Sequence, residues 1–200
     1  MTERAAENAG RTDIRVYKRL SDVTTLGPGR RYCLWVQGCL RDCPGCVSQR
    51  ARPLDGGYLM SPGALALEIA LSAPDGITVS GGEPFLQARA LGEMLGRLKA
   101  LYDAEFGVIV YTGYLYEALR DVPDAEALLR HTDLLIDGPY MREKDDGRSL
   151  RGSSNQRVIP LSARYNTPEI LSLYGAAGRE TETRSEAGGT LTIGIPRTNH

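Results

Sequence analysis

The sequence predicts an α/β protein whose central sheet is mostly parallel. Segments with the composition of buried strands alternate along the chain with segments of helical periodicity, which is the pattern of βα units. The strand segments are apolar almost throughout, as expected of strands covered on both faces. Polar, glycine-containing motifs follow these strands, and the carboxyl ends of strands are where α/β proteins bind ligands.

The composition is that of an ordinary globular protein. The chain has 200 residues, 24% of them charged and 42% hydrophobic, which is enough for one domain with a core, or for a domain with a small appendage. The net charge of −1 argues against binding nucleic acid or a membrane surface through bulk charge. No apolar run reaches the ~18 residues that a membrane span needs, and the N-terminus lacks a signal-like apolar segment. We therefore expect a cytoplasmic protein with no membrane or nucleic-acid partner, and disorder over residues 1–13.

The first predicted elements lead into a cysteine-rich loop. A turn at 27–31 precedes a buried strand at 32–38, and the loop follows that strand directly. A helix is expected over 61–73, because Ser61 is a suitable N-cap, Pro62 lies in the first turn, and apolar residues recur at helical spacing.

The rest of the chain continues the alternation of strands and helices. Residues 76–85 contain a β-branched strand that ends in a glycine pair, and 86–104 form an amphipathic helix. The further expected elements are a strand at 106–114, mostly helical residues at 115–132, a strand and turn at 133–140, a polar loop at 142–157, a strand at 157–162, a charged excursion at 179–189 and a strand at 190–196.

Three of the four cysteines fall in one loop, as Cys39-x3-Cys43-x2-Cys46. Clustered cysteines in a reducing compartment indicate metal or redox chemistry more than disulfides. A structural zinc site is one alternative, but it normally takes four ligands. Cys33 could be the fourth, yet it lies within a predicted strand, where a free cysteine is commonly a core residue, and neither histidine is suitably placed.

The cysteine spacing favours a [4Fe–4S] cluster. A redox-active pair of Cys43 and Cys46 is a second alternative, but it leaves Cys39 unexplained. Thiolates are the usual ligands of such clusters, and three of them leave one iron open to a small molecule. The spacing C-x3-C-x2-C is the signature of the radical S-adenosylmethionine enzymes.

The motif SGGEP, at Ser80–Pro84, has two interpretations. By itself it is a strand-to-helix turn whose glycines permit positive φ. Alternatively, it is a pocket for an amino-acid moiety, in which the glycines permit close approach and Glu83 pairs with an ammonium group. The motif ends the next predicted strand after the cysteine loop, which favours the second interpretation.

With these motifs the chain resembles the radical S-adenosylmethionine superfamily. The strings GPGRRYCLWVQGC, VYTGYLYEAL, LLIDGPY and RGSSNQRVI are similar to those of the glycyl-radical-enzyme activating family, with the activating proteins of anaerobic ribonucleotide reductase as its closest members. The resemblance covers roughly residues 24–160 and the string TLTIGIP. It implies an incomplete (β/α) barrel of the radical S-adenosylmethionine type, open on one side for a bulky partner.

The resemblance also implies the cofactors and their ligands. Cys39, Cys43 and Cys46 would bind three irons of a [4Fe–4S] cluster, and S-adenosyl-L-methionine would chelate the fourth. The SGGEP motif would receive its amino group and the backbone after Pro44 would line its adenosyl side, while we expect Thr112 to contact its carboxylate or ribose. The expected cofactor-binding residues are Gly45, Cys46, Val47, Gly81, Gly82, Glu83 and Thr112.

The implied activity is formation of a glycyl radical on a partner protein. An electron from a flavodoxin or ferredoxin would enter the cluster and split the sulfonium bond, and the 5′-deoxyadenosyl radical would take a hydrogen from a glycine of an anaerobic ribonucleotide reductase. We expect the loop Arg148–Arg157 to receive the glycine-bearing segment through donors such as Arg151 and Asn155.

Two other functions stay open at this point. A radical maturase acting on a peptide or small metabolite is one alternative, and a non-catalytic iron–sulfur or zinc module is the other. Three departures leave room for a divergent member with another substrate. Val47 stands where the family commonly has an aromatic residue or histidine, and Glu83 stands where reductase activators often carry Asp. The single domain predicted for residues 14–200 also carries a C-terminal extension from about residue 165, longer than a minimal activator needs.

Overall fold

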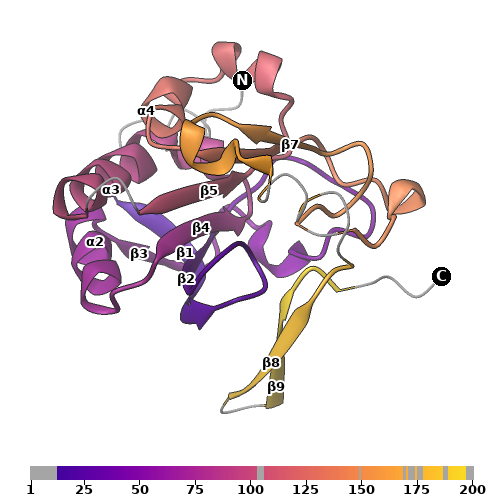
Figure 1. Ribbon diagram of the computed structural model, residues 1–200, viewed down its shortest axis with the longest axis horizontal. Coiled ribbons are helices and arrows are strands. Elements are labelled where there is room, and N and C mark those ends of the chain that lie inside the picture. The colour runs from indigo at the N-terminus through magenta and orange to yellow at the C-terminus, as the bar shows by residue number, and fades with distance from the viewer. Residues whose placement is uncertain are drawn as a thin grey trace.

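The protein is built around one seven-stranded sheet (Figure 1). The computed structural model describes residues 13–102, 106–148, 150–168, 170, 174, 178–186 and 189–196. The strand order is β3-β1-β2-β4-β5-β6-β7. The bounds are β1 Ile14–Val23, β2 Arg31–Val36, β3 Tyr58–Met60, β4 Gly76–Gly81, β5 Gly107–Tyr111, β6 Leu134–Asp137 and β7 Arg157–Pro160. Residues 1–12 of the segment expected to be disordered lie outside the described ranges.

The centre of the sheet is parallel, which confirms the predicted α/β class. Strands β2, β4, β5 and β6 pair in parallel, whereas β1, β3 and β7 join antiparallel at the two sides. The register aligns Val36 at the end of β2 with Gly81 at the end of β4. The cysteine loop and the SGGEP motif therefore leave the sheet side by side.

Three helices cover one face of the sheet. They are α2 (Pro62–Leu71), α3 (Ala88–Leu101) and α4 (Ala125–Leu129). Helix α2 begins as predicted, because the Ser61 side chain accepts a hydrogen bond from the amide of Ala64. Alternate residues of the parallel strands, such as Val79 and Val110, are fully buried against these helices in the main core.

The opposite face of the sheet carries the other set of alternating residues. Near its middle, Ile109 and Ile136 form a second apolar cluster with residues of the C-terminal segment. Cys33 and Trp35 of β2 belong to a third cluster, which includes Ile193 of a C-terminal hairpin. This hairpin consists of β8 (Thr181–Glu186) and β9 (Gly189–Gly194), which form a sheet of their own.

Several segments differ from the sequence-based predictions, among them β3, where no element was expected. No element was expected at Ile14–Val23, which forms β1; the irregular register of its pairing with β2 breaks the alternation that signals a strand. Residues 115–132 contain only a 3₁₀ turn at Tyr116–Asp121 and the short α4, since Pro123 disfavours a helical residue before it. The charged excursion at 179–189 contains strand β8.

Candidate functional site

A cavity of about 530 Å³ lies at the carboxyl ends of the parallel strands. It is bordered by the cysteine loop, by the SGGEP turn, by the turn after β5 and by the C-terminal hairpin. The residues predicted from the sequence all border it: Cys39, Cys43, Gly45, Cys46, Val47, Gly81, Gly82, Glu83 and Thr112. Motifs far apart in the sequence thus meet at one place.

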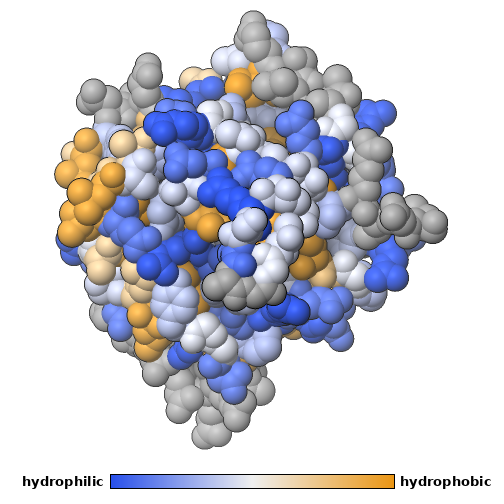
Figure 2. Space-filling model, turned by 90° about the horizontal axis from the view of Figure 1, so that it is seen from below, coloured by the Kyte–Doolittle hydropathy of each residue, from blue (hydrophilic) through white to orange (hydrophobic). Residues whose placement is uncertain are grey.

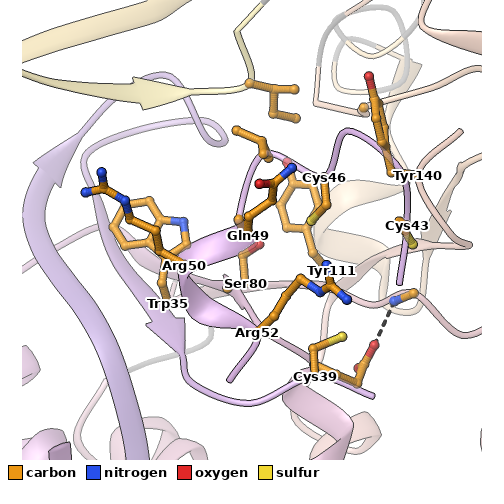
Figure 3. Close-up of a pocket in the computed structure, with 18 of the residues that line it drawn as sticks. Trp35, Cys39, Cys43, Cys46, Gln49, Arg50, Arg52, Ser80, Tyr111 and Tyr140 are labelled. Carbon is orange, nitrogen blue, oxygen red and sulfur yellow. Dashed lines mark hydrogen bonds between the residues drawn. The ribbon is translucent and has the colours of Figure 1, made fainter. Parts of the chain in front are cut away.

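The two ends of the cysteine loop are bonded to each other. After β2 the amide of Gly38 donates to the carbonyl of Ala51 at 2.8 Å, and the amide of Cys39 donates to the carbonyl of Arg52 at 2.9 Å. Within the loop the amide of Cys46 donates to the carbonyl of Cys43 at 3.1 Å. Figure 3 shows the three cysteines spread around the cavity, with Arg52 between them.

Gly45 permits the tight path of this loop. Its φ of +75° lies in the region that favours glycine, and a β-carbon there would lie 2.5 Å from Nε of Arg142. The Arg142 guanidinium therefore packs directly against the backbone between Cys43 and Cys46. Sequence reasoning assigned Arg142 only to a solvated polar loop.

Cys33 is not part of the cavity. Its side chain is 1% exposed and packs with Val23, Leu26 and Ile193, as predicted for a core residue. Burial raises the pKa of its thiol to about 12. A fourth thiolate from this position would have to leave the core, which argues against the four-cysteine zinc alternative.

The three loop thiols stand apart from one another. No three His, Cys, Asp or Glu side chains of the described residues gather closely enough to hold a single metal ion. A [4Fe–4S] cluster does not require its ligands to meet at one point, because each thiolate binds a separate iron. Burial raises the pKa of the Cys39 and Cys46 thiols, while the amide of Arg41 donates to the Cys39 sulfur at 3.4 Å.

The glycine pair is the point where β4 and the cysteine loop touch. A β-carbon on Gly82 would lie 2.7 Å from the carbonyl carbon of Gly38 and 2.9 Å from the Ala51 oxygen. Gly81 has a φ of +107°, and its β-carbon would lie 2.5 Å from the amide nitrogen of Val36. The space beside Gly82 is therefore occupied by main chain of this protein. A larger residue at Gly82 would therefore press on the main chain at both ends of the cysteine loop.

Glu83 is buried and bonded within the chain. One carboxylate oxygen accepts from the Thr112 hydroxyl at 2.8 Å and from the amide of Phe85 at 3.1 Å, and the other accepts from the amide of Gly113 at 2.8 Å. Burial raises the pKa of this carboxyl, although these three bonds oppose the shift. Glu83 thus ties the end of β4 to the turn after β5, and the Thr112 hydroxyl hydrogen is already donated.

Two polar atoms at the cavity are buried without a partner among the described residues. They are the Tyr111 hydroxyl and Nε of Arg41; the Arg41 guanidinium lies 4.6 Å from the ring centre of Tyr114. Burial raises the pKa of Tyr111 well above its usual value. Sequence reasoning did not single out Tyr111, because a lone aromatic residue at a strand end carries no signal of an unpaired hydroxyl.

The RGSSNQ string supports the turn after β6. The side chain of Gln156 accepts from the amides of Gly152 and Ser153, at 2.7 and 3.2 Å, and donates to the carbonyl of Gly138 at 2.8 Å. Asn155 donates to the carbonyl of Pro139 at 2.7 Å, and Arg151 pairs with Asp146. Each of these two side chains, expected to serve a partner's carbonyls, thus uses one of its nitrogens inside the chain, while Nε of Arg151 has no partner among the described residues.

The comparisons with known proteins agree on one family. A family model described as "4Fe-4S single cluster domain" matches residues 25–159. A protein of Enterobacteria phage T4 is 30% identical over 137 residues, which cover 66% of this chain and 85% of that protein. A protein of Vibrio cholerae is 32% identical over 141 residues, with coverages of 66% and 88%. An Escherichia coli K12 protein is 31% identical over 147 residues, with coverages of 68% and 91%. All three are named anaerobic ribonucleoside-triphosphate reductase-activating protein.

The chain belongs to this family. As a member it is a radical S-adenosylmethionine enzyme, and its cofactors are a [4Fe–4S] cluster and S-adenosylmethionine. In three dimensions it overlaps QueE from Escherichia coli with a TM-score of 0.42 at 14% identity, over 55% of this chain and 56% of that one, a likeness too low to support an argument. None of the described helices is both long and apolar enough to cross a membrane.

The cavity fits these cofactors. Three thiols border it from one loop, which is the donor set of a cluster with one open iron. The unpaired Tyr111 hydroxyl and the unpaired Arg41 nitrogen are polar groups of the kind that a bound polar molecule would satisfy. The cavity's volume of about 530 Å³ is within the range of small-molecule sites.

Proposed function

We propose that this protein generates a glycyl radical on an anaerobic ribonucleoside-triphosphate reductase. One observation carries the proposal: the three cysteines, the glycine pair and the turn after β5 border a single cavity at one edge of the sheet. When bound, the cluster and S-adenosylmethionine supply reductive cleavage of the sulfonium carbon–sulfur bond and hydrogen-atom abstraction. A flavodoxin or ferredoxin is the proposed electron donor.

The residues of the chain have separate roles in this proposal. Cys39, Cys43 and Cys46 hold the cluster, and amide groups of the loop, such as that of Arg41, stabilise the thiolates. The backbone of Gly45, Cys46 and Val47 lines the adenosyl side of the cofactor. These roles rest on the positions of the residues around the cavity.

The SGGEP turn has a structural and a binding part. Main-chain groups of Gly81 and Gly82 receive the amino group of the cofactor. Glu83 fixes that turn through Thr112 and Gly113, and its buried carboxylate attracts the ammonium group through space. Thr112 borders the cavity and remains a proposed contact of the cofactor. Its hydroxyl donates to Glu83.

The sheet provides the frame for this chemistry. We propose that it is an incomplete (β/α) barrel and that residues 14–200 form one domain with its C-terminal extension from about 165. Support comes from the helices α2, α3 and α4, which pack on one face of the sheet, and from the cavity at the carboxyl ends of the parallel strands. Among the described strands, the edges β3 and β7 are not paired with each other, and we propose that this side is open to a large partner.

The decisive experiment is an anaerobic assay with the reductase from the same genome. The cluster-loaded protein, S-adenosylmethionine and a reduced flavodoxin are expected to yield 5′-deoxyadenosine together with a glycyl radical, read by electron paramagnetic resonance. Cofactor cleavage with turnover of a small molecule or peptide, and no radical on the reductase, would reassign the protein as a maturase. Absence of any cleavage by a fully loaded protein would leave a cluster-binding module.

A further inference from the structure

The C-terminal hairpin lies outside residues 25–159, which the family model matches, yet it borders the cavity. Polar bonds fix it to β1 and the residues after it. Arg184 donates to the carbonyls of Ser21 and Asp22 at 2.7 and 2.6 Å. Thr24 donates to Glu182 through its amide at 3.2 Å and its hydroxyl at 3.0 Å. The hairpin is therefore docked, although it projects from the body in Figure 1.

Apolar residues of β9 pack against the body of the protein on the same face of the hairpin. Ile193 is 2% exposed and packs with Val23, Leu26 and Cys33. Cross-strand pairing places Ile193 opposite Glu182, so the apolar and polar anchors share one face. That face is held against the body, which leaves the edges of the hairpin free.

The edge of β9 faces the cavity. Leu191, Thr192, Ile193 and Gly194 are consecutive, and all four border it. Successive side chains point to opposite faces of a strand, so a cavity that borders four residues in a row also meets the main chain of the strand. Strand β9 pairs with β8 alone, and no main-chain group of Gly189–Gly194 bonds to described residues outside that pairing.

We propose that an extended peptide segment of the enzyme to be activated adds to the free edge of β9 as a third strand. The inference rests on the proposed function and names how that function receives its substrate. Main-chain hydrogen bonds give such an addition its affinity without requiring side chains. This suits a segment whose reacting residue is a glycine, and glycine within a strand permits close approach of another backbone.

The surface around the hairpin agrees with recognition through the main chain. Figure 2 looks from the side toward which the hairpin projects, and this face is mostly hydrophilic with separated hydrophobic patches. A broad apolar interface is therefore not what this face offers. The edge of β9 continues into the same cavity as Cys39 and Gly82, so a strand added there would carry its residues toward the cofactor.

The hairpin provides a matched pair of variants. Two residues separate the paired positions Glu186 and Gly189, so this closing pair is hydrogen-bonded. Bonded and non-bonded pairs alternate in an antiparallel ladder, which makes Thr183 and Thr192 a non-bonded pair whose main-chain groups point to opposite outer edges. Thr192→Pro blocks the β9 edge, and Thr183→Pro blocks the β8 edge with the same disturbance of the hairpin.

The test measures binding of a synthetic peptide with the sequence of the reductase segment that carries the radical glycine. The full-length, cluster-loaded protein with bound S-adenosylmethionine is used throughout. Thr192→Pro is expected to weaken peptide binding about tenfold, the cost of roughly two lost main-chain hydrogen bonds, and to lower the glycyl-radical yield. Thr183→Pro is expected to bind as the wild type does. In the wild type the peptide should slow hydrogen exchange at the Thr192 amide, an effect that needs no variant.

Several outcomes would overturn the inference. Equal weakening in both variants would show that the hairpin acts only as a structural support. Unchanged peptide binding by Thr192→Pro, while the wild type forms the glycyl radical, would refute the strand addition and leave the proposed function intact. Loss of a dimer in Thr192→Pro alone would assign the edge to a second copy of the chain. A wild type that cleaves the cofactor but never forms a radical on the reductase would instead refute the proposed function.

Discussion

Gly82 stands directly against the carbonyl group of Gly38, the residue before the first cysteine of the loop. A β-carbon on Gly82 would lie 2.7 Å from the Gly38 carbonyl carbon, while the amide of Gly82 donates to the carbonyl of Val36 at 2.7 Å. The end of β4 and the start of the cysteine loop thus form one unit. A change on either side is transmitted to both the cluster and the cofactor pocket.

Replacing Gly82 is expected to damage the cluster site together with the cofactor site. Gly82→Ala should lower the iron content after anaerobic reconstitution and reduce the free energy of unfolding by about 1–3 kcal/mol, because overpacking displaces main chain. Gly63→Ala in α2 is the matched control, since a β-carbon there meets nothing nearer than 4.0 Å. Chemical denaturation and iron analysis provide the measurements. Full iron content in Gly82→Ala with only the cofactor affinity reduced would contradict this coupling.

The cysteines are expected to divide into two classes. Anaerobic reconstitution should yield about four irons per chain in the wild type, because three thiolates can anchor one cubane. Cys39→Ala, Cys43→Ala and Cys46→Ala should each lose the cluster absorption. Cys33→Ala should keep it, with a loss of stability of about 1 kcal/mol from the small cavity left in the core. Zinc in place of iron, lost on changing Cys33, would restore the structural alternative.

Tyr111 is expected to act on the cofactor through its hydroxyl. Tyr111→Phe should keep the fold and the cluster, because the hydroxyl has no partner among the described residues. Affinity for S-adenosylmethionine should fall about threefold to tenfold, the value of roughly one hydrogen bond. Isothermal titration of the cluster-loaded protein provides the measurement.

Tyr165→Phe is the matched control for Tyr111. The Tyr165 hydroxyl accepts from the buried guanidinium of Arg31 at 2.9 Å, far from the cysteine loop along β2. Its removal should cost about 1–3 kcal/mol of stability, with cofactor affinity unchanged. The reverse pattern in the two tyrosine variants would refute both assignments.

The ion pair of Arg179 and Asp145 is expected to hold the segment before the hairpin in place. Their side chains are 2% and 5% exposed and their charged atoms lie 2.6 Å apart. Arg179→Met should reduce the free energy of unfolding by about 3–5 kcal/mol, because it leaves a buried carboxylate without its cation. Arg179→Met combined with Asp145→Leu should recover part of this loss. Thermal unfolding of the cluster-loaded protein tests the pair, and additive losses would contradict the coupling.

The sequence determined the α/β class, the position of the cysteine loop after a buried strand, and the meeting of that loop with the SGGEP turn. These follow from local patterns: apolar runs with strand or helix periodicity, an N-cap at Ser61, and motifs that end parallel strands. Cys33 was predictable as core for the same reason, since the strand around it is apolar. Such features depend on neighbours in the chain and on a general property of parallel sheets.

Only the tertiary structure decided which contacts hold the site in place and which further residues border it. The carboxylate of Glu83 is satisfied by Thr112 and Gly113, some thirty residues later in the chain. The side-chain amide of Asn155 donates to the carbonyl of Pro139. A segment predicted as a charged excursion is a strand docked on β1. Each of these depends on contacts between residues distant in sequence. Hydrogen-bond partners of buried polar groups are fixed by which main-chain groups the fold brings near them, and no local pattern carries that information.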